Sequence, residues 1–143
     1  MALDVNKIMN GTFGSLWLDG EEIGEAYGLE AKVEIQKEEV PVCGRYTTSE
    51  KFMGYKGTGT VKLRKVYSRI ASKISDQIKK GVNPTFEILS ELADPAAQGS
   101  ERVLIKGVSF NELFLANWET QQAVNEDYSF TFTDWEFFDM VKA

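Results

Sequence analysis

The last third of the chain constrains the fold most, because it concentrates aromatic residues in a strand-like alternation at the chain end. Within residues 128–133, Phe130 and Phe132 occupy even-numbered positions between serine and threonine residues. This period of two predicts a strand with one buried face. The phase then changes, since Trp135 and Phe137 are odd-numbered. Such a slip exchanges the two faces and predicts a bulge or a crossing between sheets. A terminus usually frays unless a sheet holds it, so we expect this one to be part of a sheet.

The remaining pattern predicts mainly antiparallel β structure with one helix. Apolar residues alternate with charged ones over residues 27–36, and the apolar stripe of residues 67–80 has helical spacing. Residues 1–13 are expected to form an irregular arm. Further strands are predicted at 15–18, 57–66, 85–92, 102–106 and 108–118, the last two hinged at Gly107. We therefore expect a single domain over residues 1–143, of a mainly β (α+β) class. It would be an antiparallel β-sandwich or barrel with one flanking α-helix.

Residues 38–56 interrupt the alternation with Pro41, Gly44, Gly54 and a polar tract. A long segment of this kind predicts a protruding loop, which folded back on itself could reach about 25 Å from the body. Two interpretations remain open: a disordered surface loop, or an arm that docks on a neighbouring subunit. In the second, the apolar anchors are Tyr46, Phe52, Met53 and Tyr55.

The composition argues against an enzyme. The chain has no histidine and one cysteine, Cys43, so a Ser-His-Asp or Cys-His arrangement is impossible. The glycines at 54, 57 and 59 precede a strand and lack the Gly-Lys-Ser/Thr ending of a phosphate-binding loop. We expect no catalytic residues, no cofactor and no metal.

Acidic residues are plentiful, with 22 against 16 basic residues and a net charge of −6. Their clusters have neither the paired arrangement of a glycosidase nor the spacing of a calcium loop, so they are interpreted as solvated faces. The charge does not favour tight nucleic-acid binding. It suits solubility, or a surface that DNA passes without adhering. Trp17 and Trp118 lie in apolar runs and are expected in the core.

No apolar run of about 18 residues is present, so no membrane span is expected. The N-terminal sequence lacks the basic and apolar regions of a secretory signal, which favours a cytoplasmic location.

The order of these segments resembles the core tail protein of PBSX-like prophages, the family that forms the tail tube of contractile phage tails. The resemblance is carried by residues 10–14, 17–20, 57–66 with the following helix, Trp118, 125–132 and 135–139. It implies a structural subunit that forms six-membered rings, whose sheets join into one β-barrel and stack into a tube. DNA would pass through the tube, with sheath, tape-measure and baseplate proteins as partners. The location implied is the tail of a virion or phage-like particle, assembled in the host cytoplasm.

For such a subunit, we expect interface residues on the arm and at the C-terminal strand. They are Glu39, Tyr46, Lys51, Phe52, Met53, Tyr55, Trp135 and Phe137. The alternatives are a monomeric ligand-binding β-barrel and a type VI secretion-like tube protein.

Overall fold

The structure is a computed structural model that describes residues 2–142. In these residues, eight antiparallel strands and one α-helix follow two short 3-10 turns. The turns are η1 (Val5–Lys7) and η2 (Gly11–Phe13), and the helix is α1 (Arg69–Lys79). The strands are β1 (Gly14–Leu18), β2 (Glu21–Glu22), β3 (Ala26–Pro41), β4 (Thr48–Arg64), β5 (Phe86–Leu92), β6 (Glu101–Phe110), β7 (Asn125–Phe132) and β8 (Asp134–Asp139). The predicted class, a mainly antiparallel β fold with one helix, is confirmed.

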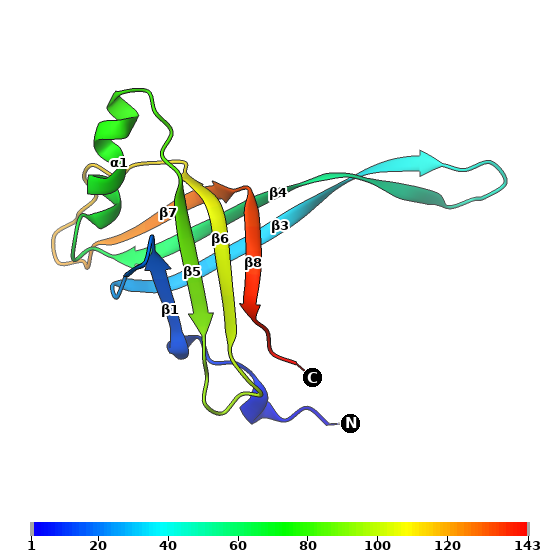
Figure 1. Ribbon diagram of the computed structural model, residues 1–143, viewed down its shortest axis with the longest axis horizontal. Coiled ribbons are helices and arrows are strands. Elements are labelled where there is room, and N and C mark those ends of the chain that lie inside the picture. Colours follow the sequence, from blue (N-terminus) through cyan, green and yellow to red (C-terminus); the bar gives the residue numbers. More distant parts are fainter. Residues whose placement is uncertain (1, 143) are drawn as a thin grey trace.

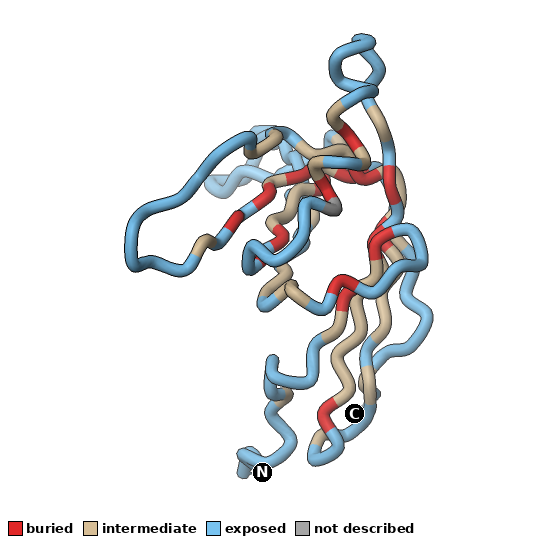
Figure 2. Tube along the Cα trace, turned by 90° about the vertical axis from the view of Figure 1, so that its left-hand side faces the viewer, coloured by how far each residue is buried: buried red, intermediate tan, exposed pale blue. Residues whose placement is uncertain are grey.

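The strands form two layers that share β6. One layer, sheet A, has the order β2-β1-β5-β6-β8, and the other, sheet B, has the order β3-β4-β7-β6. Strands of the two layers cross steeply, and α1 covers one end of the body (Figure 1). Figure 2 shows the buried positions gathered in the middle of the molecule, while the segment before β1 is almost entirely exposed.

The phase slip at the chain end is the point where the chain passes from one sheet to the other. Strand β7 pairs with β4 in sheet B, whereas β8 pairs with β6 in sheet A. At the crossing, the Thr133 amide donates to the carbonyl of Lys106 at 3.2 Å. Next to it, Gly107 has φ of 66°, a left-handed conformation that glycine adopts without strain. Of the two predicted alternatives, a bulge or a crossing between sheets, the structure has the crossing. The two strands predicted on either side of Gly107 are one strand, β6, whose two ends pair in different sheets.

The core lies between the crossed sheets and beneath the helix. Phe130, Ile88 and Val108 are completely buried at its centre, and Ile70 and Ile74 project into it from α1. Only the middle of the predicted apolar stripe is therefore buried in the core, because Tyr67 and Ile78 at its two ends remain exposed. The segment 85–92, which suits strand or helix by length, is strand β5, as predicted.

Glycines in β4 make room for two core rings. A methyl group on Gly59 would collide with the ring of Phe130 and with the carbonyl oxygen of Glu30, and one on Gly57 would collide with the ring of Phe132. These glycines serve close packing between strands, as the absence of a phosphate-loop context implies.

Replacement of Gly59 by alanine should therefore destabilise the protein by about 1–3 kcal/mol, the usual cost of overpacking a core. Backbone on one side and a buried ring on the other leave the methyl group nowhere to relax. Urea unfolding measures the change, with Gly24→Ala as control, because that position has open space. Equal stability of the two variants would contradict this packing of β4 against the rings.

Two local predictions are wrong. Residues 38–56 protrude, as predicted, but they are not a loop: β3 continues to Pro41 and β4 begins at Thr48, so only residues 42–47 connect them. Of the two interpretations, the disordered loop is therefore wrong, and the docking arm stays a prediction. Cross-strand pairing continues through residues 48–51 of the polar tract, which lie opposite residues 38–41 of β3.

The strand predicted at 108–118 ends at Phe110. The backbone amide of Ser129 donates to the side chain of Glu112 at 3.1 Å. In a continued strand, this amide would donate to a backbone carbonyl of the neighbouring strand. The Glu112 carboxylate thus takes the place of a ladder partner and the chain leaves the sheet. Trp118 consequently lies in a connection and is 74% exposed, contrary to its expected core position, whereas Trp17 is half-buried.

Candidate assembly surface

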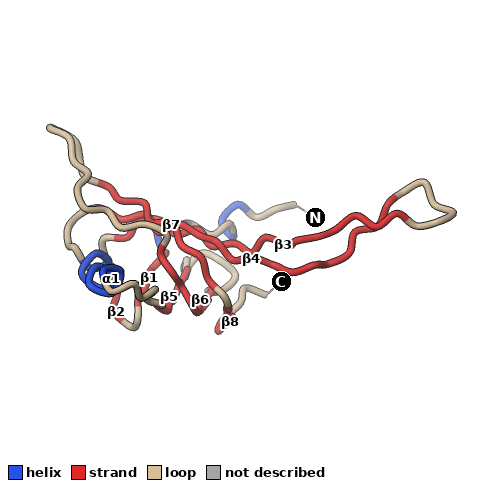
Figure 3. Tube along the Cα trace, turned by 90° about the horizontal axis from the view of Figure 1, so that it is seen from above, coloured by secondary structure: helices blue, strands red, loops and turns tan. Residues whose placement is uncertain are grey.

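The main exposed feature is a two-stranded arm that projects from sheet B. Strand β4 pairs with β7 from Gly57 onward, and Gly57 itself pairs with Val33 of β3. Beyond this point, β3 and β4 pair only with each other, and Figure 3 shows them leaving the body side by side. A two-stranded hairpin is marginally stable alone in water, so an arm of this length is expected to gain from contact with another surface.

The arm presents apolar side chains to solvent along its length. The exposed ones are Ile35, Val40, Val42, Tyr46, Phe52, Met53 and Tyr55. Exposed apolar residues that gather on one projecting element mark a surface for protein contact.

Three of the predicted interface residues come together at the base of the arm. The ring of Tyr55 lies edge-on to Trp135, with centroids 5.4 Å apart, and Phe52 lies 6.5 Å from Tyr55. Trp135 in turn contacts the core ring of Phe132 at 6.3 Å. This aromatic chain fixes the direction in which the arm leaves the body.

The structure does not bring the other predicted residues into this cluster. Glu39 faces Glu50 across the hairpin, Lys51 faces Glu38, and Tyr46 is fully exposed at the tip. Met53 is exposed along the arm, and Phe137 is 48% exposed on β8.

Sequence reasoning predicted that sheets of neighbouring copies join, but it did not identify β3 as a free edge of this surface. In the described residues, β3 is one edge of sheet B and β8 one edge of sheet A. Alternation through residues 27–36 gave the signal for β3, but we interpreted its apolar face as buried. Tyr27 and Ile35 are in fact exposed, because β3 reaches beyond the body and has an irregular register at Tyr27.

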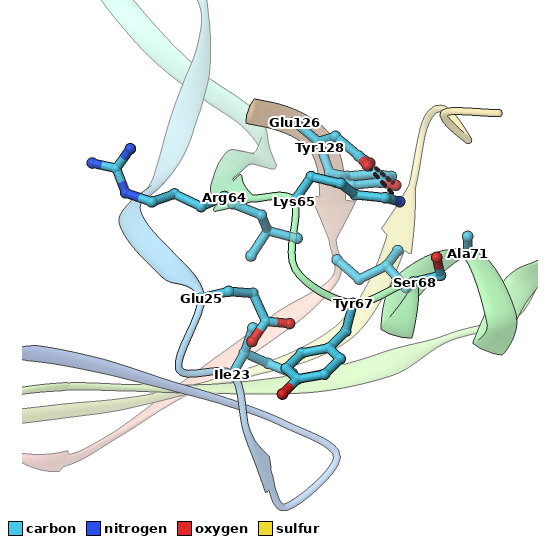
Figure 4. Close-up of a pocket in the computed structure, with 11 residues that line it drawn as sticks. Ile23, Glu25, Arg64, Lys65, Tyr67, Ser68, Ala71, Glu126 and Tyr128 are labelled. Carbon is cyan, nitrogen blue, oxygen red and sulfur yellow. Dashed lines mark hydrogen bonds and ion pairs between the residues drawn. The ribbon is translucent and has the colours of Figure 1, made fainter. Parts of the chain in front are cut away.

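A buried polar network lies on the opposite side of the body, under the start of α1. The Nζ of Lys65 lies 2.7 Å from one oxygen of Glu126, and the Tyr128 hydroxyl donates to the other at 2.7 Å (Figure 4). Glu126 is buried near the start of β7. Both oxygens of this carboxylate have a partner, so the arrangement is interpreted as structural support. Burial raises the pKa of the Tyr128 hydroxyl, and the adjacent Glu126 carboxylate raises it further.

The raised pKa of Tyr128 predicts a loss of stability in alkali. The neutral phenol is favoured in the folded protein, so the folded state keeps its proton at pH values where the unfolded chain releases it. The stabilisation that depends on this proton is fully present below about pH 10, the pKa of an unfolded tyrosine, and it declines as the pH rises above that value. Urea unfolding between pH 8 and 11 should show a steeper decline for the wild type than for Tyr128→Phe. Parallel curves for the two proteins would contradict this assignment.

The described residues show no group of three or more histidine, cysteine, aspartate or glutamate side chains that could hold a metal ion. Nor is any helix in residues 2–142 long and apolar enough to cross a membrane.

A crossed pair of sheets with free edges and an exposed apolar arm is typical of a protein that contacts other chains. The chain belongs to the phage tail tube protein family, which matches residues 1–139. It is thus a structural, non-enzymatic subunit of a phage or phage-like tail tube, as the resemblance implied. This membership favours the tube subunit over the ligand-binding barrel.

Comparisons with individual proteins agree with the family. The chain is 37% identical to the phage-like element PBSX protein XkdM of Bacillus subtilis (strain 168), over 95% of this chain and 94% of that protein. Among solved structures, it resembles a chain in the sheath-tube complex of the extracellular contractile injection system PVC in its extended state. The TM-score is 0.70 at 8% identity, over 95% of both chains. A chain of the sixfold-symmetrised anti-feeding prophage baseplate matches with a TM-score of 0.62 at 6% identity, over 87% of this chain and 90% of that one. The last two likenesses concern the fold alone.

Proposed function

We propose that this chain assembles with itself into six-membered rings, and that the rings stack into a tube through which DNA passes inside a contractile sheath. The observation that carries the proposal is the long unpaired edge of β3 together with the apolar arm that continues it. The sheath-tube complex and the sixfold-symmetrised baseplate of the two structural relatives support the symmetry and the sheath partner.

Edge pairing supplies the physical reason for a ring. Strand β3 runs for 16 residues and pairs on one side only. Soluble proteins normally shorten or cover such an edge, because unpaired amides and carbonyls invite another strand. When one edge of each copy pairs with a different edge of the next, the contact is head-to-tail and closes into a ring if the rotation allows. A closed barrel then has no free edges.

The polar face of sheet B is suited to the inside of such a barrel. The core covers the other face, so this one is free to meet water. Its charged side chains are of both signs: Glu30, Glu34 and Asp127 lie among Lys32, Lys56, Lys62 and Arg64. Charges that nearly cancel attract a phosphate backbone weakly, which allows DNA to slide past.

The arm would connect successive rings. Glu39, Tyr46, Lys51, Phe52 and Met53 would lie at the contact between rings. The cluster of Tyr55 and Trp135, with Phe137 on the β8 edge, would lie where a subunit meets its neighbours. Sheath, tape-measure and baseplate proteins would be the further partners, with assembly in the cytoplasm of the bacterial host.

Sedimentation velocity of the purified protein over a hundredfold concentration range, with negative-stain microscopy of the concentrated samples, tests this proposal. We expect rings or tubes to appear as concentration rises. A protein that remains monomeric at every concentration, and that never enters particles, would overturn it.

A further inference from the structure

A groove of about 520 Å³ opens between the two sheets on the side away from the shared strand β6. It lies between β1 and β5 of sheet A and the first residues of β3. Its aliphatic lining residues are Leu16, Ile23, Ala26, Leu29 and Leu92, of which Leu16 and Ile23 are themselves buried. The volume falls within the range of sites that enclose a bulky side chain or a small molecule.

The charges of the groove complement those of the arm tip. Glu22 and Glu91 are the charged residues among those that line the groove, and both are acidic. The Glu91 carboxylate also lies 3.5 Å from the Nε of Arg102, but that guanidinium is shared with Asp139, so this side of the groove keeps a net negative charge. The tip, residues 42–47, contains one charged residue, Arg45, which is basic. Beside it, Tyr46 extends fully into solvent. A partly apolar groove that carries carboxylates and a projecting aromatic ring beside a cation are complementary in charge and in apolar character.

The tip of the same chain does not reach this groove. Gly28 lines the groove and Pro41 adjoins the tip, and both belong to strand β3. At the rise of an extended strand they lie about 40 Å apart. Figure 1 shows β1 and the start of β3 at one end of the molecule and the hairpin tip at the other. An occupant of the groove that comes from the arm must therefore belong to a second copy.

We infer that the arm tip of one copy docks in the groove between β1 and β3 of another, with Tyr46 inserted and Arg45 facing Glu22 and Glu91. The inference rests on the proposed self-assembly and adds the receiving site. Because tip and groove are different surfaces at opposite ends of one strand, the contact is head-to-tail and can repeat without limit. That is the contact a stack of rings requires along its axis.

Disulfide trapping tests the inference directly, because Cys43 is exposed within the tip. A second cysteine at Gly24 would place a thiol on the groove, where the position has open space around it. Thr12→Cys, at another exposed position in the lining, guards against a local distortion at Gly24. The matched control is Lys32→Cys, which is exposed on the opposite face of sheet B.

Assembled samples are oxidised and run on a denaturing gel without reductant. We expect ladders of dimers, trimers and larger species for both groove variants, at least tenfold stronger than for Lys32→Cys, and their loss when Cys43→Ser is added. If tubes form and neither groove variant gives a ladder, the docking site is wrong while the tube proposal stands. If the wild-type protein forms no rings or tubes at all, the tube proposal fails, and the docking inference fails with it.

Discussion

A variant whose arm is shortened to its base should fold as the wild type does and form no tubes. We would replace residues 38–51 by Asn-Gly, which joins Lys37 to Phe52, a pair already opposite each other in the hairpin. Asn-Gly favours the tight turn that suits a two-residue hairpin connection. The variant keeps Tyr55 against Trp135, so the base of the arm retains its support.

The body should tolerate this change because the removed residues lie outside the core and the new connection is short. Circular dichroism and thermal unfolding should match the wild type, while sedimentation and microscopy should show at least a tenfold loss of polymer. Ser49→Ala, an exposed polar change that keeps the full arm, should assemble normally. Unfolding of the short variant would show that the arm belongs to the core. If the short variant formed tubes at the same protein concentration as the wild type, assembly would not depend on the arm.

Loss of the Phe130 ring should destabilise the fold more than the Gly59→Ala or Tyr128→Phe change. Phe130 is completely buried, and its ring lies 6.1 Å from Phe110 and 6.2 Å from Phe132. Truncation to alanine leaves a cavity against Gly59, which has no side chain to fill it. The expected cost is about 3–5 kcal/mol, measured by urea unfolding.

Since small domains are stable by only about 5–15 kcal/mol, this loss should leave a visible unfolded fraction near the temperature of growth. Phe138→Ala is the matched control: the same residue type, eight positions later on β8, and exposed. It should cost less than about 1 kcal/mol, as surface changes usually do. If the two variants lost equal stability, the division of the aromatic chain end into core and surface would be incorrect.

The elements that sequence reasoning predicted well are those in which local pattern and burial agree. Phe130 and Phe132 alternate because they lie in β7 of sheet B, and the alternation slips before Trp135 because that residue lies in β8 of sheet A. The helix was predictable because Ile70 and Ile74 recur at its spacing and both reach the core.

Where prediction failed, a contact with another segment determined the local structure. The polar tract before Phe52 has weak strand character, and it forms a strand because β3 lies beside it. The run after Phe110 is apolar enough for a strand, and it leaves the sheet because Glu112 binds the backbone of Ser129. In both cases the partner lies outside the segment itself, across a hairpin connection for the polar tract and 17 residues away for Glu112, so the periodicity of the segment does not reveal it.

The candidate surface was predictable only where its residues stand out in the sequence itself. Aromatic residues of the arm stand out by composition, so Phe52 and Tyr55 could be proposed as interface residues. The groove could not, because it forms only where Leu92 of β5 and Leu29 of β3 come together across two sheets. The buried ion pair of Lys65 and Glu126 was missed because a charged residue gives no sign of its burial in the sequence.

The most direct test of the proposed tube is an electron cryomicroscopy reconstruction of the assembly formed by the purified wild-type protein. We predict sixfold rings in which the β3 edge of each copy pairs with a strand of the next. The polar face of sheet B would line the channel, and each arm would reach an adjacent ring. Rings that leave the β3 edge unpaired, or a channel lined by another face, would contradict this assembly.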